Sequence, residues 1–407
     1  MIPVQAISFL GLLTFVGIAY GLSENRKIIA WRTVITGIAL QFIFAFLILK
    51  TDTGHHFFKW LGDIFNLLLV YTQEGSEFVF GNLAKPSGSW GFLFFTMVLP
   101  TIIVISSLMS VLYHLGIMQI IVKGMAYAMM KVMKISGAES LAAAANIFLG
   151  QTEAPLVIKP YVDKMTPSEI MCLMTGGMAT IAGGVLVAYI GFGIEASHLL
   201  AASFMAAPAS IVFSKLMVPE TGIPVTMNQC DLDSEKTASN VIDAAATGAS
   251  EGLKLAVNVG AMVLSFIALI ALFNGLLSWF FNLFGLENIT FELIMGYINA
   301  PFAWLLGIPW EDCLKVGSVL GKRIVLNEFV AYVDLAQLKS SLSDRSMMLT
   351  TYALCGFANL SSIAIQIGGI GTMSPIQRKT IIKYGFKSLI AGTLACYMTA
   401  AIAGLLI

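Results

Sequence analysis

Eight long apolar stretches limit what this chain can fold into more than any other feature of its sequence. They cover residues 3 to 22, 29 to 50, 90 to 115, 168 to 190, 197 to 217, 255 to 283, 346 to 370 and 380 to 405. A helix of about 20 apolar residues is long enough to cross the hydrocarbon core of a bilayer. Only 11% of the residues are charged, whereas soluble domains carry about 25%. We therefore predict an all-α polytopic membrane protein with about eight transmembrane helices.

The charge balance and the cysteines argue against several other classes of protein. The chain carries 23 basic and 23 acidic residues, so it has no excess of positive charge with which to bind nucleic acid. Its 5 cysteines are scattered and form no Cys-x-x-Cys pair, which argues against a zinc site or a disulfide framework. The sequence also lacks the phosphate-binding pattern G-x-x-x-x-G-K, which argues against pumping driven by ATP.

Lysines and arginines gather in alternate connections between the apolar stretches. They lie near residues 26 to 32, 123 to 134, 215 to 254 and 378 to 387. Short cytoplasmic loops collect basic residues, so this pattern places both termini outside the cytoplasm. Within the third group, the polar stretch 219 to 254 is predicted to be a cytoplasmic connector that contains a helix.

Two segments are too polar to be ordinary spans and are predicted to be re-entrant helical hairpins. Residues 138 to 165 have apolar arms around a polar centre at 151 to 153, and residues 311 to 341 have the same pattern around a centre at 327 to 328. The charge pattern requires each hairpin to enter and leave the membrane on the same side.

The two hairpins are followed by matching features, which predicts an internal repeat. Fifteen residues after Glu153 comes Ser168-Glu169, and fifteen after Glu328 comes Ser343-Asp344; both pairs are typical of helix N-termini. The next apolar stretches are interrupted by small and polar residues at 180 to 184 and 356 to 362. By the charge pattern the first hairpin opens from the inside and the second from the outside, which predicts an inverted repeat. Such repeats are common in secondary transporters, whose binding site lies at the repeat interface.

The predicted organisation has five parts. They are residues 1–135 with three spans and an interfacial helix near 56 to 72, 136–218 with the first repeat, 219–254 with the connector, 255–310 with a scaffold helix and an interfacial helix near 291 to 308, and 311–407 with the second repeat and last span.

Glu153 and Glu328 lie at the polar centres of the hairpins, where a carboxylate is costly. Charged residues at membrane depth are rare and mark pathways or binding sites. One interpretation is a structural ion pair with Lys159, or with Lys322 and Arg323. We favour the other, in which each carboxylate accepts hydrogen bonds from a polar solute.

Neutral polar residues accompany the carboxylates. Gln151 and Thr152 precede Glu153, while Asn359 and Ser362 are three residues apart in the second interruption. Each alone would be typical of helix packing in a membrane. Their position beside a carboxylate and a helix break favours a binding site, and indicates a cation-coupled carrier for a small hydrophilic solute.

Three motifs carry a resemblance to a known family. They are Gly150-Gln-Thr-Glu-Ala-Pro155, Asn327-Glu-Phe-Val-Ala-Tyr332 and Gly356-Phe-Ala-Asn-Leu-Ser-Ser362. They resemble the signature segments of the concentrative nucleoside transporters, and the length and span pattern resemble the bacterial members. The resemblance implies a homotrimer in the bacterial inner membrane, with a transport domain that moves past a fixed scaffold in an elevator-like cycle.

The resemblance also implies roles for individual residues. Gln151, Thr152 and Glu153 would contact the nucleobase, Glu328, Asn359 and Ser362 would hold the ribose hydroxyls, and Phe357 would pack against the solute.

Four residues are candidate ligands for a coupling sodium ion. Asn146 and Thr180 offer side-chain oxygens, and Leu149 and Ile181 lie at broken helix ends that offer backbone carbonyls. Hard cations prefer such oxygen ligands. The sodium site of the family is similar to this set. Some bacterial members are proton-coupled and depart from Gln-Thr-Glu-Ala-Pro, which this chain retains, so we expect sodium symport and no other cofactor.

Three alternatives remain at this point. One is a nucleoside symporter coupled to protons in place of sodium. A polytopic membrane enzyme would use Glu153 and Glu328 as an acid/base pair. A channel would carry the same solute without concentrating it.

Overall fold

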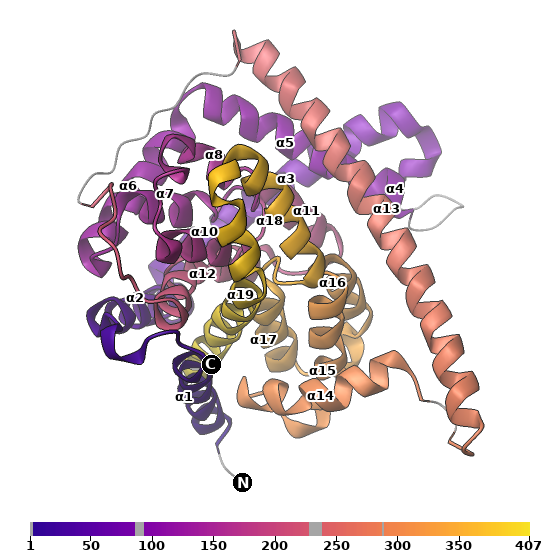
Figure 1. Ribbon diagram of the computed structural model, residues 1–407. Coiled ribbons are helices and arrows are strands. Elements are labelled where there is room, and N and C mark those ends of the chain that lie inside the picture. Colours follow the sequence, from indigo (N-terminus) through magenta and orange to yellow (C-terminus); the bar gives the residue numbers. More distant parts are fainter. Residues whose placement is uncertain (1–2, 86–92, 228–237, 287–288) are drawn as a thin grey trace.

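Figure 1 shows the computed structural model, which describes residues 3–85, 93–227, 238–286 and 289–407. All regular structure in these residues is helical. In chain order the helices are α1 (Val4–Gly21), η1 (Arg26–Ile28), α2 (Trp31–Lys50), α3 (Asp52–Phe80), η2 (Gly81–Ala84), α4 (Phe94–Met97), α5 (Leu99–His114), α6 (Ile117–Met133), α7 (Gly137–Ala145), α8 (Ala154–Val157), α9 (Lys159–Val162), α10 (Pro167–Ala179), α11 (Gly183–Gly191), α12 (Ala196–Met217), α13 (Val241–Asn282), α14 (Phe291–Leu305), α15 (Trp310–Val325), α16 (Glu328–Gln337), η3 (Lys339–Ser341), α17 (Asp344–Leu354), α18 (Leu360–Met373), η4 (Pro375–Gln377) and α19 (Arg378–Leu406).

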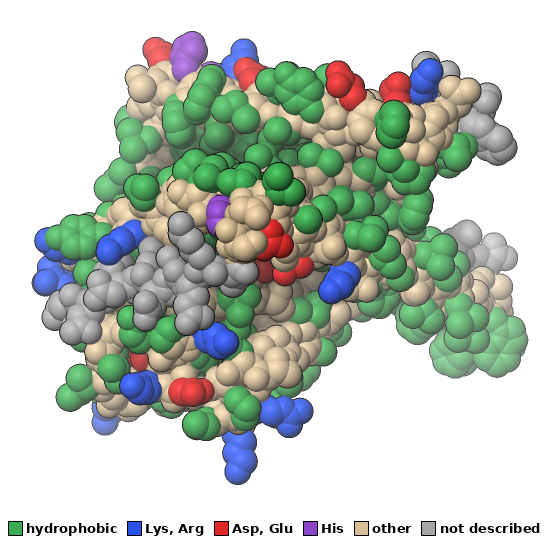
Figure 2. All heavy atoms as spheres, turned by 90° about the horizontal axis from the view of Figure 1, so that it is seen from above, with side chains coloured by type: hydrophobic (Ala, Val, Ile, Leu, Met, Phe, Trp, Pro, Cys, Tyr) green, Lys and Arg blue, Asp and Glu red, His purple; other side chains and the backbone are tan. Residues whose placement is uncertain are grey.

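The predicted all-α polytopic architecture is confirmed. Among the described residues, 7 helical segments are long and apolar enough to cross a membrane, and each corresponds to one predicted stretch. The eighth stretch, 346 to 370, is divided between α17 and α18. Viewed from above, hydrophobic side chains cover much of the outline, whereas charged side chains are scattered (Figure 2). Such an apolar outline is expected of a protein that lies in lipid.

One predicted boundary falls inside a helix. The sequence placed the end of the connector between residues 254 and 255, but α13 runs without a break from Val241 to Asn282. Asn240 accepts a hydrogen bond from the backbone N–H of Asp243 and so caps this helix at its start. Both halves of α13 are rich in helix-forming residues, so the helix continues through the point where the composition changes from polar to apolar. The change in composition therefore indicates where the helix passes from water into lipid. Residues 228–237 of the connector lie outside the described part of the chain.

The centre of the molecule is formed by α10, α11, α12 and α19. In the most apolar window of α12, 94% of the residues are buried, compared with 33% for α1 and α2 and 11% for α13, which slants along one side (Figure 1). Small residues permit this close packing in lipid: a Cβ on Gly392 of α19 would lie 2.5 Å from the Cβ of Met178. The first repeat and the last helix therefore form the core that positions the site.

The two ends of the chain lie on the same side of the molecule (Figure 1). Ser8 of α1 donates a hydrogen bond to the carbonyl of Leu306 (2.9 Å), and a Cβ on Gly404 of α19 would lie 2.6 Å from the hydroxyl oxygen of Ser8. This agrees with an even number of membrane crossings; the side on which the ends lie stays a prediction.

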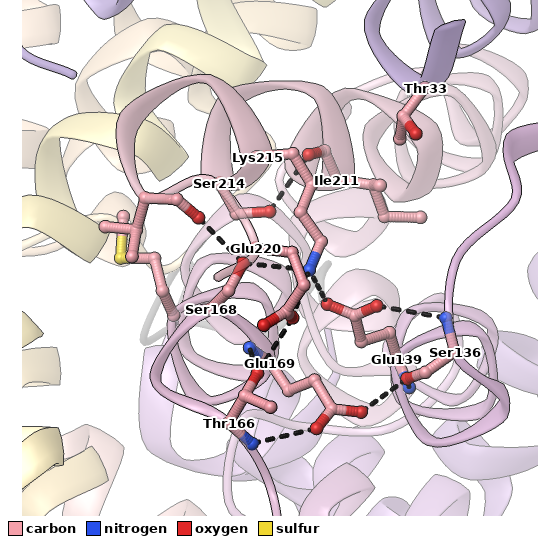
Figure 3. Close-up of polar contacts among 12 residues, drawn as sticks. Thr33, Ser136, Glu139, Thr166, Ser168, Glu169, Ile211, Ser214, Lys215 and Glu220 are labelled. Carbon is pink, nitrogen blue, oxygen red and sulfur yellow. Dashed lines mark hydrogen bonds and ion pairs between the residues drawn. The ribbon is translucent and has the colours of Figure 1, made fainter. Parts of the chain in front are cut away.

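A buried cluster of charges holds the first repeat together where α7, α10 and α12 meet (Figure 3). Lys215 of α12 forms an ion pair with Glu139 of α7 and donates a hydrogen bond to the hydroxyl of Ser168 (2.9 Å). The hydroxyl of Ser136 donates to Glu169 of α10 (2.6 Å). Because each charge has partners, the cluster satisfies groups that would be costly to bury alone.

The start of α10 differs from the sequence prediction by two residues. Thr166, not Ser168, is the N-cap, and its hydroxyl accepts a hydrogen bond from the backbone N–H of Glu169 in a capping box. Pro167 explains the difference, because proline favours the first helical position and an extended residue before it. In the second repeat, Ser343 caps α17 as predicted.

Candidate functional site

The first hairpin consists of α7, an irregular segment at residues 146–153, and two short helices, α8 and α9. Ser136 and Glu139 form a capping box that starts α7. The sequence predicted an apolar return arm, and the structure divides that arm at Ile158. Proline stands near the start of both pieces, at 155 and 160, and a proline within a helix removes a backbone hydrogen bond.

The second hairpin is more regular. It consists of α15, a two-residue connection and α16, whose first residue is Glu328. The side chain of Asn327 caps α16 by accepting a hydrogen bond from the backbone N–H of Val330 (2.9 Å). This local cap places the carboxylate of Glu328 at the N-terminus of a helix, where the unpaired N–H groups favour negative charge.

Both interrupted helices are present, and the two interruptions touch. The first separates α10 from α11 around Thr180, and the second separates α17 from α18 around Phe357. The backbone N–H of Phe357 donates a hydrogen bond to the carbonyl of Thr180 (3.2 Å). Asn359 caps α18 by accepting from the backbone N–H of Ser362 (2.9 Å). Each break thus satisfies backbone groups that a continuous helix would pair internally.

A cavity of about 130 Å³ lies where the hairpins and the breaks meet, and it brings together all seven residues predicted to bind the solute. These are Gln151, Thr152, Glu153, Glu328, Phe357, Asn359 and Ser362. Apart from Asn327 and Ser361, the remaining wall has no polar side chain, and it includes Val185 of α11 and Leu255, Val259, Met262 and Val263 of α13. This wall was not predicted, because apolar residues inside a span look the same in the sequence whether they face a cavity, lipid or the protein core.

The carboxylate of Glu328 is held by hydrogen bonds and not by a cation. Asn359 donates to its Oε2 (2.9 Å), and the hydroxyl of Tyr189 donates to its Oε1 (3.3 Å). Only 5% of Glu328 is exposed. Tyr189 comes from α11 and stacks on Tyr332 of α16, with 4.2 Å between ring centroids. The sequence analysis missed Tyr189 because a tyrosine in an apolar helix is unremarkable until packing shows what its hydroxyl meets.

The ion-pair interpretation of the two carboxylates is wrong. Lys322 pairs with Asp334 and Glu292 instead. The guanidinium of Arg323 is fully buried and donates to the carbonyls of Ala353 (2.9 Å) and Gly356 (3.3 Å). In the part of the chain that the structure describes, the salt bridges found include neither site carboxylate. Arg323 therefore donates hydrogen bonds to backbone carbonyls at the break between α17 and α18, and not to a site carboxylate.

Glu153 differs from Glu328 in its surroundings. Its Oε2 accepts a hydrogen bond from the backbone N–H of Gly150 (2.9 Å), three residues away on the same hairpin. The residue is exposed, and its side chain lines the open cavity. Its neighbour Gln151 is buried, and its amide Nε2 donates to the hydroxyl of Ser362 (3.0 Å). The first hairpin thereby contacts the second repeat directly.

The four candidate sodium ligands lie together where the first hairpin meets the first break. Thr180 donates its hydroxyl to the carbonyl of Gly176 (2.8 Å), and a Cβ on Gly176 would lie 2.8 Å from Nδ2 of Asn146. Gly183 donates to the carbonyl of Phe148 (3.0 Å), which ties the segment next to Leu149 to the segment after Ile181.

Asn146 makes this region suitable for a cation. The residue is 1% exposed, and neither its amide oxygen nor its amide nitrogen has a hydrogen-bond partner among the described residues. An unpaired buried polar group costs about 1–3 kcal/mol, so an oxygen-binding ion would satisfy a group that is otherwise destabilising. The hydroxyl of Thr180 keeps lone pairs free after its one donated bond.

Two re-entrant hairpins, two broken helices and a carboxylate-lined cavity inside an apolar bundle define a polytopic membrane carrier. Three family models match the chain: "Na+ dependent nucleoside transporter N-terminus" at residues 10–83, "Nucleoside recognition" at 95–196, and "Na+ dependent nucleoside transporter C-terminus" at 198–404. The chain belongs to the Na⁺-dependent, concentrative nucleoside transporter family.

Known relatives span bacteria and animals. The chain is 47% identical over 399 residues to the uncharacterized transporter YutK of Bacillus subtilis (strain 168), with 98% of each chain covered. It is 41% identical over 418 residues to human solute carrier family 28 member 3, covering 99% of this chain and 60% of that protein. The structure of CNTnw in an inward-facing substrate-bound state is similar, with a TM-score of 0.93, 40% identity, and coverage of 99% and 97%.

Membership of this family removes one alternative. The family consists of multi-pass membrane transporters, so the protein is a transporter and not a polytopic enzyme that uses Glu153 and Glu328 as an acid/base pair.

Proposed function

We propose that this protein imports nucleosides by sodium-coupled symport. The observation that carries the proposal is a buried carboxylate, Glu328, which faces the cavity, accepts hydrogen bonds from Tyr189 and Asn359, and forms no salt bridge within the described residues. A carboxylate is the strongest hydrogen-bond acceptor in a protein, and the vicinal hydroxyls of a ribose are two donors at matching spacing. A solute of this kind completes the hydrogen bonding of Glu328 without neutralising its charge.

The other residues of the cavity divide between the two halves of a nucleoside. Asn359 and Ser362 lie beside Glu328 and bind the ribose hydroxyls with it. Gln151, Thr152 and Glu153, on the tip of the first hairpin, bind the nucleobase directly or through water. Phe357 packs against the solute, with the apolar residues of α13 opposite.

Sodium is the proposed coupling ion, and its ligands are Asn146, Thr180 and the carbonyls of Leu149 and Ile181. Gly150 follows Leu149 in the chain and Ala182 follows Ile181, and both Gly150 and Ala182 line the cavity. Ion and solute would therefore order the same two segments. The chain retains Gln-Thr-Glu-Ala-Pro at 151–155, which favours sodium over protons.

The available energy is sufficient for concentration of the solute. One Na⁺ that enters down about 100 mV releases about 2.3 kcal/mol, and a roughly tenfold ion gradient adds about 1.4 kcal/mol. Together they support accumulation of a neutral nucleoside by several hundredfold. One ion per solute is enough.

The transport cycle is proposed to be an elevator-like form of alternating access. The two repeats are joined through the breaks and through Gln151 and Ser362, which favours movement of the site as one body. Structures of CNTnw and its variants represent inward-facing, outward-facing and intermediate states. We further propose a homotrimer in the bacterial inner membrane, with both termini outside the cytoplasm.

Uptake into proteoliposomes tests this function. Under an inward Na⁺ gradient, radiolabelled nucleoside should accumulate above its equilibrium level, and replacement of Na⁺ by choline should abolish the excess. Uptake that reaches equilibrium without exceeding it would identify a channel, and accumulation driven only by an inward proton gradient would identify proton coupling. A panel of purine and pyrimidine nucleosides defines the preferred base.

A further inference from the structure

A second glutamine lies behind the cavity and contacts the glutamine that lines it. Gln366 of α18 is fully buried. Its amide Nε2 donates hydrogen bonds to the carbonyl of Met174 on α10 (3.0 Å) and to Oε1 of Gln151 (3.2 Å). Gln151 in turn donates from Nε2 to the hydroxyl of Ser362 (3.0 Å). The four groups form a chain of hydrogen bonds that starts at a backbone carbonyl and ends at the cavity.

The direction of every bond in this chain is fixed by its first member. A backbone carbonyl only accepts, so the amide that meets Met174 must present nitrogen. That same nitrogen then donates to Gln151, which must present oxygen, and the opposite side of the Gln151 amide must be its nitrogen. Ser362 accepts from that nitrogen. Its own proton is therefore left free to donate to a solute oxygen.

Two observations indicate that this arrangement is built for the site. A Cβ on Gly177 of α10 would lie 2.8 Å from Cβ of Gln151 and 2.9 Å from Nε2 of Gln366, so the absence of a side chain at Gly177 allows the two glutamines to meet. The oxygen Oε1 of Gln366 has no hydrogen-bond partner within the described residues. Burial of an unpaired amide oxygen is costly. In Gln366 this cost accompanies the orientation in which the amide nitrogen donates both hydrogen bonds.

We propose that Gln366 is a positioning residue that sets the polarity of the site. It holds the amide of Gln151 in one orientation, so that Ser362 donates to the ribose while Glu328 accepts from it. This inference rests on the proposed nucleoside function. Its consequence is that Gln366, which does not line the cavity, determines how strongly the protein distinguishes a ribonucleoside from a deoxynucleoside.

Gln366→Glu reverses the chain with almost no change of shape. When it is ionised, the new carboxylate can only accept; when it is protonated, its one O–H donates to the carbonyl of Met174, which itself only accepts. In both forms the carboxyl accepts from Gln151 in place of donating to it, and the amide of Gln151 turns over. Ser362 then donates to Gln151 and no longer to the solute. Binding of uridine, 2′-deoxyuridine and 3′-deoxyuridine is measured by calorimetry on the purified full chain. The measurements give two affinity ratios, uridine to 2′-deoxyuridine and uridine to 3′-deoxyuridine. The larger of these two ratios should fall by about fivefold, which is the effect of losing one neutral hydrogen bond.

Gln377 supplies a matched control. It is also a buried glutamine, and its Nε2 donates to the carbonyls of Asp163 (3.3 Å) and Met165 (2.9 Å). Gln377→Glu should therefore cost similar stability and leave the ratios unchanged. In a Ser362→Ala background, Gln366→Glu should no longer alter the ratios.

The possible outcomes distinguish failure of this inference from failure of the proposed nucleoside function. Wild-type protein that binds uridine, with equal weakening of all three solutes in Gln366→Glu, would assign Gln366 a merely structural role and overturn the proposal. Wild-type protein that binds no nucleoside would overturn both. If Gln366→Glu does not yield folded protein, Gly177→Ala decides by the same criterion, because its methyl group pushes the two glutamines apart while leaving their chemistry intact.

Discussion

The two hairpins share a plan but hold their carboxylates differently. Glu153 is exposed to the cavity, and its recorded bond comes from Gly150 on its own hairpin. Glu328 is buried at the start of the ten-residue helix α16, and its bonds come from Tyr189 and Asn359, outside its hairpin. One carboxylate is thus positioned locally, whereas the other is positioned by three elements of the fold.

This difference suggests a division of labour. Ribose is common to all nucleosides, so a rigid, preorganised acceptor at Glu328 suits it, since preorganisation reduces the cost of ordering on binding. Bases differ in size and in hydrogen-bonding groups, so a less constrained tip around Glu153 suits them. Asn146, whose side chain has no hydrogen-bond partner among the described residues, lies at the end of α7 in the same first hairpin, which would make that hairpin the part that responds to the ion.

The sharpest way to break this comparison is Glu328→Gln. The substitution removes the charge that strengthens the hydrogen bonds from the ribose, each worth about 1.5–3 kcal/mol when one partner is ionised. We expect nucleoside affinity to fall by roughly a hundredfold or more, with the protein still monodisperse in detergent. Uptake at the wild-type level would contradict the assignment of ribose to Glu328.

Asn146→Ala tests the link between the first hairpin and the ion. Loss of one oxygen ligand should raise the Na⁺ concentration for half-maximal uptake by about tenfold, the effect of losing about 1.4 kcal/mol. The order of preference among nucleosides should not change. A Na⁺ titration of uptake measures the effect, and an unaltered titration would remove Asn146 from the proposed site.

Tyr189→Phe asks whether the rigid carboxylate depends on elements outside its hairpin. The change deletes the hydroxyl that donates to Glu328 (3.3 Å) but keeps the ring that stacks on Tyr332. Affinity should fall by about fivefold, as for one hydrogen bond, and equally for purine and pyrimidine nucleosides. A change confined to one class of base would place Tyr189 at the other end of the site.

Glu153→Gln is expected to have the smallest effect on affinity and the largest effect on choice of base. The substituted amide keeps an acceptor oxygen, and the residue is exposed to the open cavity, where water can replace a lost bond, so the loss should be about 1 kcal/mol or less. Relative uptake of adenosine, guanosine, cytidine and uridine should change by a few fold. The discrimination between ribose and deoxyribose should stay as in the wild type. If that discrimination were lost instead, the two hairpins would not divide the solute as proposed.

Much of the candidate site could be read from the sequence because its signals are local. A carboxylate between two apolar arms, or a Gly-Gly or Asn-x-x-Ser interruption of a span, is visible without knowledge of any contact. Six residues predicted in this way line one cavity, together with Phe357, which only the family resemblance implied. The possible ion pairs of the site carboxylates could not be judged from the sequence, because they depend on neighbours in the fold. Lys322 forms its ion pair with Asp334, and Arg323 donates to backbone carbonyls at the helix break.

Hydrophobicity and helix interruption depend on adjacent residues, so the lipid environment, the spans, the hairpin tips and the breaks could be predicted from the sequence. The contact of Tyr189 with Glu328, the contact of Gln366 with Gln151, and the apolar wall from α13 became visible only in the folded molecule. These residues look ordinary in the sequence because tyrosine, glutamine and leucine are common fillers of membrane helices. Their roles arise from atoms brought within hydrogen-bonding or packing distance by helices that lie far apart in the chain.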